Sequence, residues 1–344
     1  MKAAIINVTG YAGVELARIL KRHPEVELTQ VTGRGAVGQK LGEAFPHLGD
    51  IDLVIENEVT ESVDIVFSAL PQTASAEALI PILESGVKAV DISADFRLKD
   101  ASEYEEWYGV AHPRSSLLEE SVYGLTELNR SDISKSALVA NPGCYPTSAI
   151  LALAPAIQAG IINEDVIIDS KSGVSGAGRG LSLNTHYSEV NENVSAYSVS
   201  GHRHLPEITQ ELGRIRSDFQ PRVTFLPHLI PMTRGILSSC YVSLLDGSLP
   251  TGQSGIDEVQ SLYREFYKDE PFIRVVSSSP MTKHTLGNNN CVIYPTVDLR
   301  TNRLMVISCI DNLVKGAAGQ AIQNMNLMLG LPETQSLEQL ALYP

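Results

Sequence analysis

The first ninety residues alternate short apolar runs with segments of helical periodicity. Residues 2–8 form a continuous apolar run, 14–22 have the spacing of a helix, and 26–32 are apolar again. Together they make a strand–helix–strand unit of about 30 residues, the length of a parallel βαβ unit. Strands over 63–70 and 87–92 flank a helix over 76–85. Because such strands are buried on both faces, we predict an α/β, Rossmann-type dinucleotide-binding domain.

The second half has many strands and few helices. Two helical segments are predicted among these strands, one over 207–216 and a longer one over about 254–268. The predicted strands cover 166–170, 222–226, 235–245, 273–276, 291–299 and 304–310. Strands without long crossover helices pair mostly with antiparallel neighbours. We therefore predict an α+β second domain with a largely antiparallel sheet. Residues 98–129 are expected to be rich in loops.

The last helical pattern sets the domain order. Apolar residues recur at helical spacing from Leu313 to Leu329, Asn312 could cap the helix, and Gly330 with Pro332 would stop it. So apolar a helix must be buried, and we expect it to pack on the first domain. The prediction is a dinucleotide-binding domain of residues 1–144 and 312–344, with residues 145–311 inserted.

Charge and cysteine content narrow the class of protein. The 344 residues carry a net charge of −14, which argues against binding to nucleic acid or to an anionic membrane through the global field. No apolar run approaches the ~20 residues of a membrane span, and no signal peptide is expected. Four widely spaced cysteines without a CxxC pair indicate a reduced, cytoplasmic protein with no structural metal site.

A glycine-containing turn follows the first strand and opens the first helix. It consists of Thr9, Gly10, Tyr11, Ala12 and Gly13. Glycines let the backbone approach a pyrophosphate, whose charge the helix N-terminus favours. Asn7 stands where the fingerprint would have another glycine, but Asn tolerates left-handed backbone better than most residues. The turn is a weak signal alone and a stronger one between a strand and a helix.

The end of the second strand indicates which dinucleotide binds. Thr32-Gly33-Arg34-Gly35 contains no acid to hold a ribose hydroxyl, and Arg34 favours a 2′-phosphate, hence NADP. The alternative is a solvated loop charge. Ser68, Leu70 and Pro71 lie at the carboxyl end of the strand over 63–70, the edge where open α/β sheets bind ligands. Arg97, after the next strand, could pair either with a substrate anion or with Asp95.

Cys144 is the candidate nucleophile. Asn141, Pro142 and Gly143 form a turn between a strand and a long apolar helix, which places Cys144 at a helix N-terminus. The outward N–H groups there favour thiolate over thiol, and covalent catalysis needs such a thiolate. A small buried hydrophobe is the alternative, and this stretch alone does not decide between them.

Two further segments supply an anion site and a base. Residues 171–180 are mostly small and contain Arg179, which suits a backbone nest for an oxyanion or phosphate; a flexible loop is the alternative. His202 and His204 lie just before the helix over 207–216. His202 follows Gly201 and is the candidate acid/base, with His204 as a structural histidine. Metal binding by the two histidines and Glu207 is the weaker interpretation.

With these residues in hand, the chain resembles the N-acetyl-gamma-glutamyl-phosphate reductase family of the aspartate-semialdehyde-dehydrogenase-like group. The resemblance covers nearly the whole chain and rests on the runs 9–13, 91–98, 141–147, 175–179, 201–208 and 312–317. Asn-Pro-Gly-Cys-Tyr-Pro-Thr and His-Arg-His-x-Pro-Glu-Ile are the most specific of these. The chain departs from the family pattern at Asn7, usually Gly, and at Gln72-Thr73, usually His-Gly.

The resemblance implies roles for many residues. Cys144 would be the nucleophile and His202 the base, with His204 as the competing candidate. Ser175, Gly176 and Asn312 would join the residues that bind NADP. Substrate or phosphate would contact Arg97, Asn141, Gly178, Arg179, His204 and Glu207. The resemblance also implies that the second domain is the catalytic and oligomerisation domain. No metal is implied, and a homodimer or homotetramer is expected.

The implied reaction is NADPH-dependent reduction of N-acetyl-glutamyl 5-phosphate to the 5-semialdehyde and phosphate, through a Cys144 thioester, in arginine biosynthesis. Three alternatives remain at this stage. The same chemistry could act on an aminoadipyl phosphate of lysine biosynthesis. A Cys–His hydrolase would use no nicotinamide. A non-enzymatic nucleotide sensor would bind NADP without a reactive Cys144.

Overall fold

The computed structural model describes residues 1–343, and the chain divides into two compact units. Unit 1 comprises Met1–Gly143 and Ala317–Gln339; unit 2 comprises Cys144–Gly316 and the described residues after Gln339. The sequence placed these boundaries after residues 144 and 311. The structure has them after residues 143 and 316, and it groups the end of the described chain with unit 2.

Unit 1 is built on a parallel sheet of seven strands in the order β3-β2-β1-β4-β5-β7-β6. The strands are β1 (Lys2–Ile6), β2 (Glu27–Thr32), β3 (Ile55–Glu56), β4 (Ile65–Ser68), β5 (Lys88–Asp91), β6 (Val122–Tyr123) and β7 (Leu138–Ala140). The order reverses beside β1, so the carboxyl ends of β1 and β4 border the crevice in which such sheets bind ligands. This confirms the predicted Rossmann-type domain.

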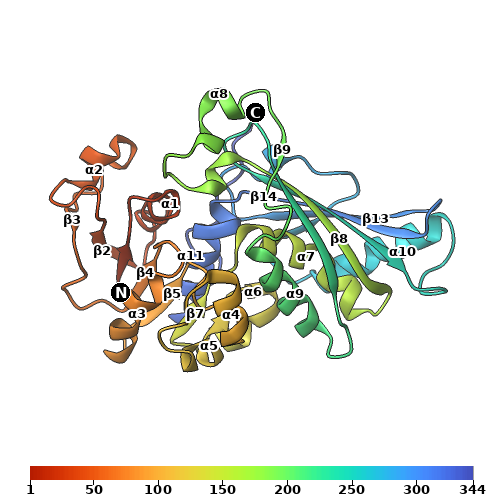
Figure 1. Cartoon of the computed structure of the whole chain (residues 1–344), viewed down its shortest axis with the longest axis horizontal. Coiled ribbons are helices and arrows are strands. Elements are labelled where there is room, and N and C mark those ends of the chain that lie inside the picture. The colour runs from red at the N-terminus through yellow and green to blue at the C-terminus, as the bar shows by residue number, and fades with distance from the viewer. Residues whose placement is uncertain (344) are drawn as a thin grey trace. The chain divides into compact units, whose positions relative to one another are not determined.

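Helices cover the sheet of unit 1 (Figure 1). They are α1 (Tyr11–Leu20), α2 (Leu41–Ala44), α3 (Ser75–Glu84), α4 (Ala101–Tyr108), α5 (Ser116–Glu120), α6 (Thr126–Ile133) and α11 (Gly319–Met328). The last helix packs against α1, α6 and β5, as expected from its apolar pattern. The prediction that 98–129 is loop-rich was wrong, because α4, α5 and half of α6 lie there. These helices are short, and α4 buries only Tyr104, so no apolar period reveals them.

The approach to α11 corrects a second prediction. Asp311, not Asn312, accepts the first free N–H groups, from Leu313 at 2.8 Å and Val314 at 3.2 Å. Asn312 accepts the N–H of Gly235 at 2.8 Å and donates to the Ser175 hydroxyl at 2.9 Å. A π-helical turn, Val314–Ala318, then precedes α11. Asn312 thus joins separate segments of unit 2, a role that its place in the sequence does not reveal.

Unit 2 contains a second sheet of seven strands, in the order β12-β13-β14-β11-β8-β10-β9. Its strands are β8 (Ile162–Ser172), β9 (Ser195–Ala196), β10 (Arg222–Leu229), β11 (Ile236–Leu244), β12 (Ile273–Val275), β13 (Cys291–Asp298) and β14 (Arg303–Ile310). Only β8–β10 and β12–β13 are parallel pairs, so the sheet is largely antiparallel, as predicted.

One face of this second sheet is packed by helices. α7 (Cys144–Gln158) contacts β11 and β14 and is flanked by α9 (His204–Ile215) and α10 (Gln253–Phe266), below the strands in Figure 1. A short helix, α8 (Tyr187–Val190), lies in the segment between β8 and β9. On the other face, Ile167, Tyr241 and Met305 stand opposite one another on neighbouring strands. Ile167 is 43% exposed, and its two neighbours are partly exposed.

Candidate functional site

Cys144 is the first residue of α7, as the Asn-Pro-Gly turn predicts. Residues 145–157 of this helix are buried, so the helix is fixed against the sheet of unit 2 and its free N–H groups lie at Cys144. Cys144 is partly exposed, whereas Cys240, Cys291 and Cys309 are buried. Burial raises the pKa of the Cys240 and Cys309 thiols to about 12. Cys144 is therefore the cysteine that combines solvent access with the positive end of a helix.

Gly316 lies directly against the nucleophile candidate. A Cβ atom on Gly316 would stand 2.8 Å from the Cβ of Cys144 and 3.3 Å from its Cα. Real Cβ atoms do not approach each other so closely, hence any side chain at 316 must displace Cys144. The glycine of the Asn312–Ala317 run is explained by this contact.

His202 stands in an aromatic cluster that includes Tyr145, the residue after Cys144. The ring of Tyr145 is 5.7 Å from the His202 ring, edge to face, and the rings of Tyr197 and Phe225 lie at 5.5 and 5.4 Å. The Tyr197 hydroxyl donates to the Tyr145 hydroxyl at 3.0 Å. The residue that follows the cysteine thus touches the candidate base, although the two are far apart in the sequence.

The imidazole of His202 is neutral near pH 7. Burial, followed by the charge of Arg203, lowers the pKa of His202 to about 4. Its Nδ1 accepts the backbone N–H of His204, the first residue of α9, at 3.0 Å. The ring of His204 contacts the His202 ring at 4.8 Å. Glu207, in the first turn of α9, is fully buried.

The glycine-rich segment after β8 shares a cavity with His202. Val174–Ala177 form a 3₁₀ turn in which Ser175 is buried and its hydroxyl is held by Asn312. Gly178 has a φ of +84°, which favours glycine, and Arg179 is exposed. Gly176 and Ala177 line a cavity of about 500 Å³ together with Tyr197 and His202. The structure therefore brings part of the predicted anion nest to the predicted base.

The predicted cofactor turn has the geometry that a dinucleotide needs. A Cβ on Gly13 would fall 2.6 Å from Val8 Cα, so only glycine lets α1 start this close to the end of β1. Asn7 adopts the left-handed backbone expected of it, with φ +64°, and its amide donates to the Ala69 carbonyl at 2.8 Å. Thr9 donates to the Asn7 side chain at 3.3 Å. Gly10, Tyr11 and Ala12 are at least partly exposed beside it.

The other predicted cofactor residues differ in accessibility. Arg34 is exposed just beyond β2, where it is free to reach a 2′-phosphate. Leu70 and Pro71 are accessible after β4, whereas Ser68 is fully buried and its hydroxyl shares a hydrogen bond of 2.6 Å with the Ser75 hydroxyl. The absence of an acid after β2, the Gly13 contact and exposed Arg34 together fit NADP.

Arg97 and Asn141 hold the turn that precedes Cys144 in the chain. Arg97 is 5% exposed and donates to the carbonyls of Asn141 at 2.9 Å and Ile92 at 2.8 Å. The amide of Asn141 donates to the Ala317 carbonyl at 3.1 Å. Both side chains therefore have partners within unit 1, and neither of the two sequence interpretations of Arg97 included these carbonyls.

Sequence reasoning gave no role of their own to two groups: Tyr197 in unit 2, and a carboxylate pair in unit 1 of which Asp95 was named only as a possible partner of Arg97. Tyr197 was not singled out, because no motif surrounds it; only its hydroxyl contact with Tyr145 marks it. The other group is a buried pair of carboxylates, Asp91 and Asp95. Asp91 accepts the hydroxyls of Ser75 at 2.5 Å and Ser93 at 2.8 Å. Asp95 accepts N–H groups at the start of α3.

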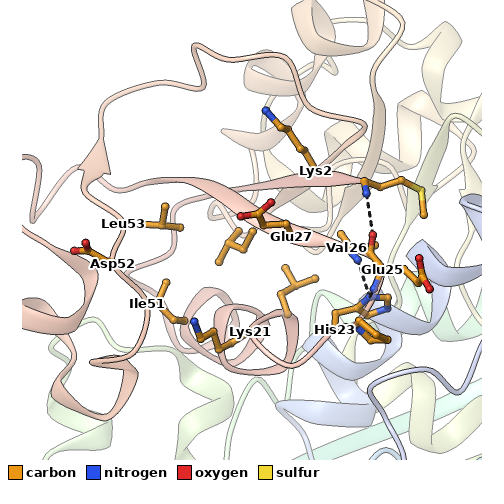
Figure 2. Close-up of a pocket in the computed structure, with 13 residues that line it drawn as sticks. Lys2, Lys21, His23, Glu25, Val26, Glu27, Ile51, Asp52 and Leu53 are labelled. Atoms are coloured by element: carbon orange, nitrogen blue, oxygen red, sulfur yellow. Dashed lines mark hydrogen bonds between the residues drawn. The ribbon is translucent and has the colours of Figure 1, made fainter.

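A second hollow lies at the opposite end of the first sheet. Figure 2 shows Lys2 and Glu27 at the amino ends of β1 and β2, beside a pocket of about 620 Å³. The amino group of Met1 donates to the Glu25 carbonyl at 2.8 Å. Ligands of open α/β sheets bind at the carboxyl ends of strands, so this pocket is not part of the candidate site.

Within residues 1–343, no three His, Cys, Asp or Glu residues are grouped so as to hold a metal ion. In the same residues, no helix is long and apolar enough to cross a membrane.

Comparison with known proteins gives a domain family for each of the two units. The family described as semialdehyde dehydrogenase, NAD binding domain, matches residues 2–136, and the semialdehyde dehydrogenase dimerisation domain matches residues 144–312. Aspartate semialdehyde dehydrogenase II from Vibrio cholerae superposes with a TM-score of 0.72 at 17% identity, covering 96% of this chain and 98% of that one. The Candida albicans enzyme with NADP gives 0.71 at 16% identity, covering 95% and 98%. These likenesses show the fold.

Curated relatives are much closer in sequence. The N-acetyl-gamma-glutamyl-phosphate reductase of Dehalococcoides mccartyi is 56% identical over 343 residues, which cover 100% of this chain and 99% of the relative. That of Pelotomaculum thermopropionicum is 52% identical over 352 residues, with 100% and 99% covered. With Cys144, the dinucleotide turn and the two matched domains in place, the chain belongs to the N-acetyl-gamma-glutamyl-phosphate reductase family.

Proposed function

We propose that this chain reduces N-acetyl-glutamyl 5-phosphate to N-acetylglutamate 5-semialdehyde and phosphate with NADPH, as a step of arginine biosynthesis. Relatives that span the whole chain carry the name of this activity. The single observation that carries the assignment is Cys144, the partly exposed cysteine at the start of the buried helix α7. An acyl phosphate reductase needs a thiolate that attacks well and leaves well, and this position provides one.

The residues of unit 1 are proposed to hold the cofactor. The turn 9–13 would bind the pyrophosphate, since Gly13 lets the chain pass close to β1, and Arg34 would pair with the 2′-phosphate. Backbone and accessible atoms of 68–71 would border the cofactor, because the buried Ser68 hydroxyl is turned to Ser75. When bound, NADPH supplies the hydride that reduces the acyl carbon.

The residues of unit 2 are proposed to carry the chemistry. Cys144 would form the thioester, and His202 would act on the oxygen of the reacting carbonyl. The exposed backbone of Gly176 and Gly178, with Arg179, would hold the departing phosphate, while Ser175 and Asn312 fix the shape of that turn. Buried Glu207 and partly exposed His204 would set the start of α9, whose first N–H holds the ring of the preceding His202.

Reverse turnover tests the proposal. Purified protein is given NADP, phosphate and either N-acetylglutamate semialdehyde or its analogue with one more carbon, and NADPH formation is followed by its absorbance. We expect fast reduction of NADP with the first substrate, loss by orders of magnitude in Cys144→Ser, and normal NADPH binding in that variant. Preference for the longer substrate would assign the aminoadipyl reaction instead, and undiminished turnover of Cys144→Ser would exclude the thioester.

We further propose that the protein is a homodimer formed through the sheet of unit 2. The matching family is described as a dimerisation domain, and helices pack on one face of this sheet. The opposite face presents a row of Ile167, Tyr241 and Met305 across three strands. Beside this row, Asp169 is paired with Lys171 at 2.9 Å. An apolar row on a sheet face is the kind of surface that a second copy covers. A cytoplasmic location follows from a mechanism that needs a reduced Cys144.

A further inference from the structure

The two ring nitrogens of His202 have different surroundings. Nδ1 accepts the N–H of His204 at 3.0 Å. A backbone N–H can only donate, so Nδ1 must carry its lone pair and the proton of the neutral ring must lie on Nε2. In residues 1–343, Nε2 makes no hydrogen bond to another group of the protein, and the ring borders the cavity shared with Gly176 and Ala177.

Several groups around this ring oppose its protonation. The first N–H of α9 points at Nδ1, and a helix N-terminus carries partial positive charge. Arg203 adds a full charge, and the neighbouring rings of Tyr145, Tyr197, Phe225 and His204 cover part of the His202 ring. Burial, and then the charge of Arg203, lowers the pKa of His202 to about 4. A helix N-terminus elsewhere in enzymes likewise keeps an imidazole neutral so that it polarises a carbonyl.

We propose, on the basis of the reaction proposed above, that His202 is a neutral hydrogen-bond donor through Nε2–H. It holds the oxygen of the reacting carbonyl and does not remove the proton of the Cys144 thiol. The start of α9 is the positioning element, because its first N–H selects the tautomer that has the proton on Nε2.

The chemistry balances without a base at His202. Cys144 ionises to solvent before substrate binds. Its sulfur then forms a bond to the acyl carbon while the bond from that carbon to the phosphate oxygen breaks, and phosphate leaves with the electron pair. After hydride reaches the thioester carbon, the negative oxygen accepts the Nε2–H hydrogen bond. Its electron pair re-forms the carbonyl, and the carbon–sulfur bond breaks to return the thiolate. The one proton consumed overall ends on the departing phosphate, taken from water.

Two substitutions of His202 distinguish the contribution of the Nε2 donor from that of the Nδ1 acceptor. In His202→Gln the side-chain amide NH₂ can occupy the place of Nε2, which keeps the donor and loses the acceptor of the helix. In His202→Asn the amide oxygen can replace Nδ1, which keeps the acceptor and loses the donor. Loss of one oxyanion donor commonly lowers kcat by about 10²–10³. We expect such a loss for His202→Asn, and a loss of no more than about tenfold for His202→Gln. Equal losses in the two variants, both folded and binding NADPH, would overturn the proposal.

Two measurements are independent of turnover. Nitrogen NMR of the NADP-free protein with ¹⁵N-histidine should show His202 with bare Nδ1 and protonated Nε2, unchanged between pH 6 and 8. The rate of Cys144 alkylation by iodoacetamide should have the same pH profile in wild type and His202→Gln, since no base is lost. A proton on Nδ1, or an alkylation profile displaced by the substitution, would contradict the donor role. Failure of the thioester chemistry itself would appear separately, as full turnover of Cys144→Ser.

Discussion

Gly316 and Cys144 approach each other so closely that a Cβ on the glycine would lie 2.8 Å from the cysteine Cβ. Gly316→Ala must therefore push Cys144 from its place at the start of α7. Forced overpacking costs about 1–3 kcal/mol, and a misplaced nucleophile loses catalysis in addition. We expect kcat to fall at least tenfold, with the Kd for NADPH unchanged.

A matched control for this change is Gly213→Ala, in the last turn of α9. A Cβ there meets Pro221 at an ordinary 3.5 Å, and alanine is the better helix former. This variant should keep wild-type kcat and melt no lower than wild type. If Gly316→Ala were as active as Gly213→Ala, the contact with Gly316 would not hold Cys144 in place.

Exposed Arg34, after β2, is predicted to distinguish NADPH from NADH. Arg34→Ala should raise the KM for NADPH about tenfold or more, corresponding to about 1.4 kcal/mol, and leave the KM for NADH nearly unchanged. The control is Arg22→Ala, which removes another exposed arginine of unit 1. Steady-state kinetics with both cofactors checks this. An equal rise for both cofactors would contradict a role at the 2′-phosphate.

The buried Asp91 makes stability depend on pH. Burial, and then the charge of Asp95, raises the pKa of Asp91 from 3.8 to about 6. A carboxyl with a raised folded pKa costs no stability below pH 3.8, and its cost grows as pH rises to about 6. Asp91→Asn removes this titration. An amide oxygen in place of Oδ1 still accepts the Ser75 hydroxyl and the Ser93 N–H, and the Ser93 hydroxyl can turn to accept the amide N–H. The variant should melt higher than wild type at pH 8, and its advantage should shrink toward pH 4.

Thermal melts of both proteins from pH 4 to pH 8 measure that difference. Comparison with the variant is needed because burial also lowers the pKa of His23 and His112, which weakens the fold as pH falls. These histidines are shared by both proteins and cancel in the difference. A difference in melting temperature that does not change with pH would rule out Asp91 as the titrating group.

The apolar row on the sheet of unit 2 is predicted to be covered by a second copy. Ile167→Glu should convert the dimer to monomer at micromolar concentration, because a charge buried in an interface without a partner is costly. Val110→Glu in unit 1 is the control, since Val110 has the same 43% exposure. Light scattering after gel filtration gives the masses. A dimer that survives in Ile167→Glu would place the interface elsewhere.

Periodicity and turn chemistry in the sequence determined most of the architecture. The continuous apolar strands, the turn at Gly13 and the Asn-Pro-Gly turn before Cys144 predicted the parallel sheet and the helix that starts at the cysteine, because each depends on neighbouring residues alone. The run of strands with few intervening helices predicted a largely antiparallel second sheet. Short helices such as α4 escaped, since one inward residue makes no period.

Tertiary structure alone decided contacts between distant residues. Asn312 was expected to cap a helix, but the fold brings Ser175 and Gly235 to its side chain and leaves the cap to Asp311. The rings of Tyr145 and Phe225 reach His202 from segments whose separation in sequence carries no signal. The N–H that fixes its tautomer is local, but only the folded backbone aims the N–H of His204 at Nδ1. The sequence thus determined which groups could react. Their protonation and accessibility depend on burial and neighbouring charge, which exist only once the chain has folded.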